Sequence, residues 1–212
     1  MKQRNGMPPG VGGLTRRGFL QGAGSAAAGG ALAQGLLAQD AAPGELESLA
    51  GELEVELTVD GAARNVRVEP RTTLLDALRN RCEPAVTGPK LVCDRGQCGA
   101  CTVLLDGAPA YACMVLAADA RGRAIRTIEG LGAPGSLSPL QEAFCRHDAS
   151  MCGFCTPGFV MAIQACLEKK PDATREEIRS ACQGNVCRCG TYPFVFDAAL
   201  DAAGRLRAGG KR

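Results

Sequence analysis

The sequence predicts an α+β protein in which a β-grasp domain is followed by an all-α domain of four helices arranged as a bundle. Between residues 51 and 128, apolar and polar residues alternate as they do in half-buried strands. Over residues 129–212, which end in a short basic tail, the apolar positions instead recur at helical spacing. The chain of 212 residues also carries twelve cysteines, most of them in short, regularly spaced groups.

Residues 1–40 have the features of a targeting segment. The pair Arg16-Arg17 precedes an Ala/Gly-rich apolar run over residues 22–38, which resembles a twin-arginine export signal. Ala31-Leu32-Ala33 is one candidate cleavage site, and the run is too short and too rich in glycine to span a membrane. We therefore expect an export signal and leader at 1–40, a linker at 41–50, and a periplasmic mature chain without a transmembrane segment. The alternative is a disordered leader in which the arginine pair occurs by chance.

The first domain is expected to begin with a hairpin. Leu53–Val59 alternates apolar and polar residues, Asp60-Gly61 is a turn signal, and Asn65–Val68 alternates again. Further along, we expect a helix capped by Thr72 or Thr73 and running through Leu78. A strand at 102–105 and a turn at Asp106-Gly107 should lead to a return strand at 110–116 that carries Cys113. A closing strand is expected at 124–128.

The second domain has four helix starts. Ser138-Pro139-Leu140-Gln141 combines a capping residue, a proline at the first helical position and Gln three residues after the cap. Thr156-Pro157 starts a second helix, and the capping box Thr174-Arg175-Glu176-Glu177 starts a third. Pro193 opens the fourth, and four short helices predict a bundle.

The first cysteine group has the spacing C-x4-C-x2-C, with a fourth cysteine after eleven intervening residues. Its members are Cys93, Cys98, Cys101 and Cys113. This is the thiolate pattern of a plant-type [2Fe–2S] ferredoxin loop. A loop that wraps a cluster closely must turn backbone N–H groups toward sulfur, and Gly96 and Gly99 have no Cβ to block the positive φ angles that this requires.

The second cysteine group combines a C-x2-C with a C-x-C that follows after 31 intervening residues. Its members are Cys152, Cys155, Cys187 and Cys189. Four such thiolates could bind zinc tetrahedrally, but the ferredoxin-type loop on the same chain favours a second iron–sulfur cluster. Each pair precedes a predicted helix, where unpaired N–H groups can stabilise negative charge.

The overall composition gives no support to two other classes of function. A net charge of +2, an aromatic content of 4% and the absence of a long basic run make no case for nucleic-acid binding. A single histidine, His147, and the absence of G-x-S-x-G give hydrolytic chemistry poor support.

Four cysteines lie outside both groups. They are Cys82, Cys145, Cys166 and Cys182. We expect them to be small buried hydrophobes rather than disulfides or a third metal site. Arg188, between two ligands, could raise the potential of a cluster or form a surface salt bridge, and the sequence leaves both open.

Three motifs together resemble the small iron–sulfur subunit of the xanthine oxidase family of molybdenum hydroxylases. They are Cys93–Val103 (CDRGQCGACTV), Cys152–Gly158 (CGFCTPG) and Gly184–Tyr192 (GNVCRCGTY). The resemblance covers about residues 52–205. The Cys-Gly-Thr-Tyr ending and the export signal are more similar to the exported aldehyde dehydrogenase and isoquinoline oxidoreductase-like branch than to xanthine dehydrogenase.

The resemblance implies an electron-transfer subunit without catalytic residues of its own. A large partner subunit would carry molybdopterin, in its cytosine dinucleotide form, and hydroxylate an aldehyde or N-heterocycle, while the electrons would leave to a FAD-binding or cytochrome c (haem c) subunit. The second cysteine group would hold the proximal cluster and the first group the distal cluster, with Met151 and Cys189 beside the pterin. The alternatives are a free-standing two-cluster ferredoxin and a zinc- or redox-stabilised binding module.

Two positions depart from the family pattern. Met151 replaces the usual Gln before the C-x2-C, and a thioether cannot donate the hydrogen bond that an amide gives the pterin. Val92 replaces the Gly that commonly precedes the first ferredoxin cysteine, which would alter solvent access to the distal cluster.

Overall fold

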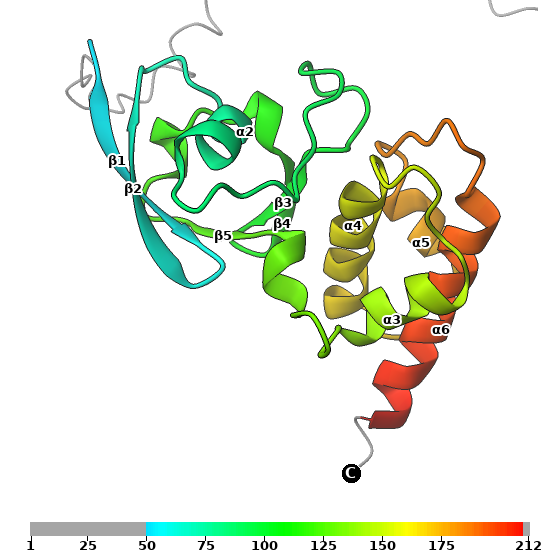
Figure 1. The fold of residues 1–212 in the computed structure, drawn as a ribbon. Helices are drawn as coiled ribbons and strands as arrows, with labels where there is room; N and C mark the ends of the chain where they lie inside the picture. The colour runs from blue at the N-terminus through cyan, green and yellow to red at the C-terminus, as the bar shows by residue number, and fades with distance from the viewer. Residues whose placement is uncertain (1–49, 210–212) are drawn as a thin grey trace, which may run out of the picture. The chain divides into compact units, whose positions relative to one another are not determined.

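The computed structural model describes residues 50–209, so the export signal and leader expected at 1–40 lie outside the described residues. Figure 1 shows strands in the first part of the described chain and helices in the second. The strands are β1 (Leu53–Val59), β2 (Ala62–Val68), β3 (Thr102–Leu105), β4 (Ala108–Tyr111) and β5 (Ala124–Arg126). The helices are α2 (Leu74–Asp76), α3 (Pro139–Arg146), α4 (Thr156–Lys169), α5 (Arg175–Ala181) and α6 (Tyr192–Gly209), with short helical turns at Ala77–Arg81, Ala112–Met114, Ala118–Ala120 and Ile128–Leu131.

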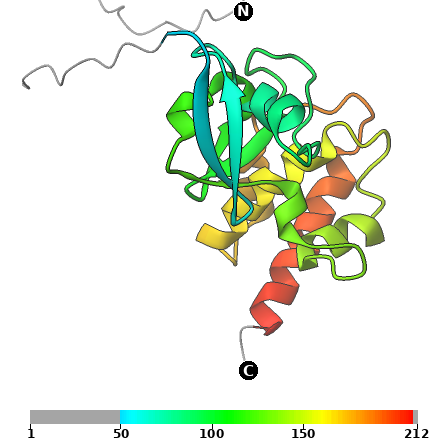
Figure 2. The same ribbon diagram turned by 60° about the vertical axis from the view of Figure 1, so that its left-hand side comes forward.

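The five strands form one mixed sheet in the order β2-β1-β5-β3-β4. The hairpin β1–β2 pairs Leu53 with Val68 and Val59 with Ala62, and β1 runs parallel to β5. β3 runs antiparallel to both β4 and β5. The hairpin is seen at two angles in Figures 1 and 2. This mixed sheet, with α2 packed against it, confirms the α+β class and matches the expected β-grasp arrangement.

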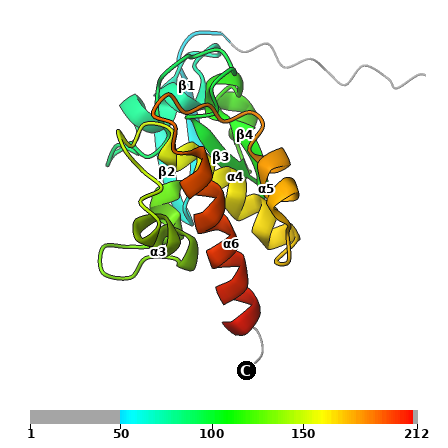
Figure 3. The same cartoon turned by 90° about the vertical axis from the view of Figure 1, so that its right-hand side faces the viewer.

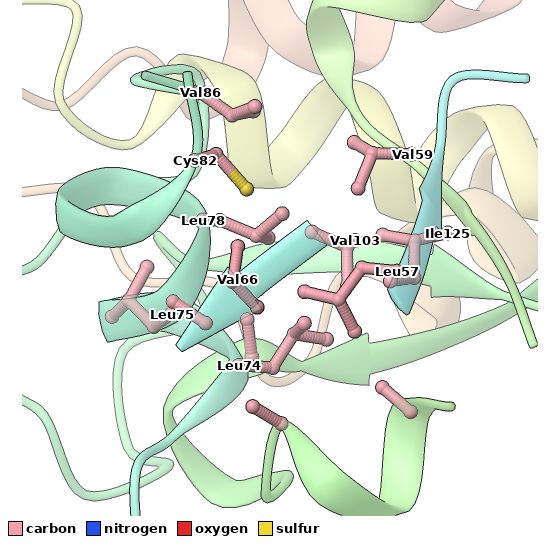
Figure 4. Close-up of a cluster of buried hydrophobic side chains, with 14 of the residues drawn as sticks. Leu57, Val59, Val66, Leu74, Leu75, Leu78, Cys82, Val86, Val103 and Ile125 are labelled. Carbon is pink, nitrogen blue, oxygen red and sulfur yellow. The ribbon is translucent and has the colours of Figure 1, made fainter. Parts of the chain in front are cut away.

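The core of the sheet domain lies between the sheet and α2, as Figure 4 shows. Alternate residues of the hairpin, among them Leu57 and Val66, point into it and are buried. Leu74 and Leu78 come from the helix side, which Thr73 caps by accepting a hydrogen bond from the Asp76 N–H at 3.2 Å. The alternation in the sequence is therefore the inward face of the sheet.

A second core holds α3, α4, α5 and α6 together (Figure 3). α6 packs against α3, α4 and α5. Both predicted capping boxes are present, at Ser138 and Thr174. Phe159 is fully buried and meets Tyr192 edge-on, with ring centroids 5.5 Å apart. No helix among residues 50–209 is long and apolar enough to cross a membrane.

Contacts also join the sheet domain to the helices. α4 packs against β3, where Leu104 lies with Met161 and Ala165 in a small buried cluster. Next to it, Arg126 on β5 donates to both carboxylate oxygens of Glu168 on α4, at 2.5 and 2.6 Å. These contacts fix the side of the sheet on which the helices lie.

The structure corrects the extent of two strands. The return strand ends at Tyr111 rather than at 116, because Tyr111 pairs with the first residue of β3 and the chain beyond it faces the cysteine loop. Cys113 therefore lies in the helical turn Ala112–Met114 and not on the strand. The closing strand ends at Arg126, after which Thr127 caps the helical turn Ile128–Leu131.

One prediction about the extra cysteines is wrong. Cys145 is exposed, because α3 buries Leu140, Ala143 and Phe144 and the next position points away from the core. Cys82 and Cys182 are buried as expected, and burial raises the pKa of both thiols, that of Cys182 to about 12. Cys166 is half-buried.

Candidate metal centres

The structure brings the four cysteines of the first group together in two contacting pairs. The thiol of Cys93 lies within hydrogen-bonding reach of Cys98, and Cys101 lies within reach of Cys113. The helical turn after β4 therefore returns Cys113 to the loop that carries the other three thiols. The predicted ligand set is thus gathered at one place.

Backbone N–H groups of the loop point at these sulfurs. The Gly96 N–H donates to Cys113 Sγ at 3.3 Å, and the Gln97 N–H donates to Cys93 Sγ at 3.4 Å. Gly96 has a φ of +70°, and a Cβ there would also come within 2.9 Å of the Met114 side chain. Both facts support the expectation that glycine is needed to turn the amides toward sulfur.

The second group is gathered at the helix starts. Cys155 is the N-cap residue of α4 and its thiol contacts that of Cys187, while Cys152 contacts Cys189. The Cys189 N–H donates to Cys187 Sγ at 3.3 Å. The C-x2-C and the C-x-C therefore meet, although 31 residues separate them.

Each group contains one thiol whose pKa is raised and one whose pKa is lowered. Cys101 is buried and Cys155 half-buried, and desolvation is the main reason that the pKa of each is raised to about 12. Burial also acts on Cys93 and Cys187, but hydrogen-bond donors outweigh it and lower the pKa of each to about 7. For Cys187 these donors include the hydroxyl and the N–H of Thr191. A thiol whose pKa is raised must release its proton to bind a metal.

The donor set fits a two-iron centre in each group. Four thiols arranged two and two suit a [2Fe–2S] cluster, in which each iron takes a pair of thiolates. The paired arrangement therefore favours iron–sulfur ligation over one tetrahedral zinc.

The two cysteine loops are hydrogen-bonded to each other. The Val186 N–H donates to the Cys98 carbonyl oxygen at 2.9 Å. The neighbouring side chain, Asn185, is buried and donates through Nδ2 to the Gly99 carbonyl oxygen at 3.0 Å. Gly158, in the first turn of α4, has no room for a Cβ, which would overlap this same carbonyl. Backbone from one site thus touches backbone from the other.

Large apolar side chains are exposed around both sites. Met151, which is 71% exposed, Phe154 and Val186 are exposed and each is the sequence neighbour of a cysteine of the second group, and exposed Phe194 lies in the first turn of α6. Near the first group the exposed apolar side chains are Leu91, Val92 and Met114. Clustered apolar exposure of this kind marks surfaces that contact other proteins.

Three residues at the second site carry contacts that the sequence did not suggest. Asn185 joins the two loops, Thr191 places its Oγ1 3.1 Å from Cys187 Sγ, and the Tyr192 hydroxyl accepts from the Cys187 N–H at 2.8 Å. All three lie within three residues of the C-x-C, and this proximity in the sequence is the one feature that could have indicated a role at the site. Arg188 is exposed and makes no salt bridge with another residue of 50–209.

Comparison with known families assigns both parts of the chain to iron–sulfur domains. Residues 57–125 match the family described as "2Fe-2S iron-sulfur cluster binding domain". Residues 127–200 match the family described as "[2Fe-2S] binding domain". The second match weighs further against zinc at the second site.

Curated relatives are similar over most of the described chain. The nicotine 6-hydroxylase small subunit of Paenarthrobacter nicotinovorans is 50% identical over 154 residues, which are 73% of this chain and 92% of that protein. The aldehyde oxidoreductase iron-sulfur-binding subunit PaoA of Escherichia coli (strain K12) is 41% identical over 171 residues, 74% of each chain.

Solved structures agree with these relatives. A chain of quinoline 2-oxidoreductase from Pseudomonas putida 86 superposes with a TM-score of 0.69 and 41% identity, covering 74% of this chain and 98% of that chain. The aldehyde oxidoreductase from Desulfovibrio desulfuricans ATCC 27774 gives the same TM-score at 42% identity, but the match covers only 17% of that longer chain.

Proposed function

Since the chain belongs to the xanthine oxidase family of molybdenum hydroxylases as a small iron–sulfur subunit, its role is electron transfer, and we propose how its residues perform that role. Cys93, Cys98, Cys101 and Cys113 would hold the distal [2Fe–2S] cluster. Cys152, Cys155, Cys187 and Cys189 would hold the proximal one. When bound, these clusters supply one-electron transfer.

The observation that carries this proposal is the hydrogen bonding between the two cysteine loops. Val186, next to the ligand Cys187, donates to the carbonyl of the ligand Cys98 at 2.9 Å. One hydrogen bond and a short run of covalent bonds therefore connect the two ligand sets. The hydrogen bond from Asn185 and the close approach of Gly158 to Gly99 hold the two loops at a fixed position relative to each other. The role of these residues is to hold two redox sites at a fixed separation.

A large molybdenum subunit is the partner of this chain, as its relatives are small subunits or correspond to a fraction of longer enzymes. In finer detail, we propose that the surface around Met151 and Cys189 faces the pterin of that subunit, in its cytosine dinucleotide form. Both residues are exposed. Met151 cannot donate a hydrogen bond, so its contribution would be apolar contact that excludes water. The four helices would form a bundle whose cysteine-bearing end makes this contact.

The surface around the distal site would dock the next electron carrier, a FAD-binding or a cytochrome c subunit. Leu91, Val92 and Met114 give this surface its apolar character. We further propose that the chain reaches the periplasm by the twin-arginine route, which carries folded proteins. Export after folding would let the cysteines arrive as metal ligands rather than as disulfides.

Purification of the tagged full-length chain from its native host tests this function. We expect co-purification of a molybdenum-containing subunit, and two distinct EPR signals from reduced [2Fe–2S] clusters in the complex. A stable monomer that carries both clusters but recruits no molybdenum-containing protein would instead support the free-standing ferredoxin carrier. The similarity to subunits of larger enzymes does not favour that alternative.

A further inference from the structure

Thr191 lies between the last cysteine of the proximal site and the start of α6. Only 2% of its surface is exposed, and its Oγ1 lies 3.1 Å from Cys187 Sγ. Its backbone N–H is directed at the same sulfur. A buried hydroxyl needs a hydrogen-bond partner, and the partner here is a sulfur of the proposed cluster site.

The direction of this hydrogen bond follows from the chemistry of the ligand. A metal-bound cysteine is a thiolate and has no proton to give, so the Thr191 hydroxyl must be the donor. The other buried polar side chains among the described residues bond to oxygen: Thr102 and Asn185 to the Gly99 carbonyl, and Thr127 to the Asp60 carboxylate. Thr191 is the exception.

A threonine in front of a helix is ordinarily an N-cap, whose hydroxyl accepts from an N–H of the first turn. Within residues 50–209, no backbone N–H donates to the Thr191 hydroxyl. Its carbonyl oxygen accepts the first intrahelical bond, from the Val195 N–H at 3.0 Å, as that of an N-cap residue does. The side chain is thus directed to Cys187 rather than to the helix end.

The distal site has no equivalent of this hydroxyl. Within residues 50–209, apart from contacts between cysteines, the hydrogen bonds to the distal sulfurs come from backbone N–H groups such as those of Gly96 and Gln97. The proximal sulfur of Cys187 receives a backbone N–H from Cys189 and, in addition, the side-chain O–H of Thr191. The Thr191 hydroxyl is therefore a hydrogen-bond donor to sulfur that the proximal site has and the described part of the distal site lacks.

We propose that Thr191 is a positioning residue that acts through Cys187 to raise the reduction potential of the proximal cluster. Reduction adds one electron, and a donor to a ligand sulfur stabilises the more negative state more strongly. The hydroxyl thereby sets how readily the proximal site is reduced relative to the distal one. This inference rests on the proposed function, because it requires a cluster bound at Cys187.

The test is an EPR-monitored redox titration of the assembled enzyme, with Thr191→Val and Thr191→Ser. Valine keeps the shape without the hydroxyl, and serine keeps the hydroxyl. Losing one charge-assisted hydrogen bond should make reduction of the proximal cluster about tenfold less favourable, which is about 59 mV for a one-electron couple. The distal signal should not move, and Thr191→Ser should titrate close to wild type.

Thr127→Val is the matched control, because Thr127 is also a buried threonine but bonds to Asp60. We expect it to lower stability without moving either potential. Unchanged proximal potential in Thr191→Val would overturn the proposal. The proposal would also be overturned if the proximal EPR signal disappeared in both Thr191→Val and Thr191→Ala but survived in Thr191→Ser, because the hydroxyl would then be needed for cluster insertion rather than for the potential. If the wild-type enzyme lacks a second EPR signal, the proposed function itself fails.

Discussion

The contact between Gly158 and Gly99 predicts opposite effects for the same substitution at two helical glycines. Gly158 is in the first turn of α4, and a Cβ there would overlap the Gly99 carbonyl oxygen. Gly204 is inside α6, and a Cβ there would meet no atom within 4 Å. Neither has a positive φ, so alanine is sterically allowed by the backbone at both positions.

Two opposing contributions determine whether each substitution raises or lowers the free energy of unfolding. Replacing glycine by alanine inside a helix stabilises by up to about 1 kcal/mol, and Gly204→Ala should show most of that gain. At Gly158 the same gain is set against overpacking, which costs about 1–3 kcal/mol. The overlapped atom is backbone and is held by hydrogen bonds from Asn185 and Thr102, so it cannot move aside cheaply. We expect Gly158→Ala to lose about 1–2 kcal/mol.

The assay is thermal unfolding of both variants, followed by far-UV circular dichroism and by the visible absorption of the clusters. For a chain of this size, 1 kcal/mol moves the melting temperature by about 2–4 °C. Gly204→Ala should melt higher than wild type and Gly158→Ala lower, with its clusters lost earlier. The reasoning fails if Gly158→Ala melts at or above the wild-type temperature.

Two ion pairs give further predictions. Arg126→Met should lower the free energy of unfolding in denaturant by about 1 kcal/mol, because it breaks the two hydrogen bonds to Glu168. Arg67→Met is the control and should change nothing measurable, because the pairs of Arg67 with Glu52 and Glu54 are longer and exposed. Equal losses of stability in the two variants would contradict this. Asp201→Asn should lower the melting temperature, because hydrogen bonds from Arg146 and then Arg205 hold the pKa of Asp201 at about 2. A lowered folded pKa contributes stability that is fully present above the unfolded value of about 4 and is lost as the pH falls toward the folded value. The deficit should therefore be present at pH 5 and above and shrink between about pH 4 and pH 2, and a deficit that vanishes above pH 5 would count against the assignment.

The cysteine groups could be predicted from the sequence because cluster ligands are partly local. Three of the distal ligands lie within nine residues, and each proximal pair directly precedes a helix whose first turn contains a proline, Pro157 in α4 and Pro193 in α6. Hydrophobic alternation was likewise enough to place β1 and β2, because each strand buries one face.

The contacts between distant segments could not be predicted in the same way. Asn185 and Thr191 acquire their roles from groups that tertiary folding brings to them, and their local sequence does not distinguish them from loop residues. Cys113 was expected on a strand because the apolar run continues from residue 110 to 116, whereas the pairing with β3 ends at Tyr111. Cys145 was expected in the core because an apolar residue type was given more weight than its angle on the helix.

Iron content and EPR spectra of Cys93→Ser and Cys187→Ser test the central claim most directly. If two separate sets of thiolates each hold a two-iron cluster, each variant should lose about half of its iron and one of the two signals, while the other signal survives. Full iron content with both spectra intact in both variants would contradict the account.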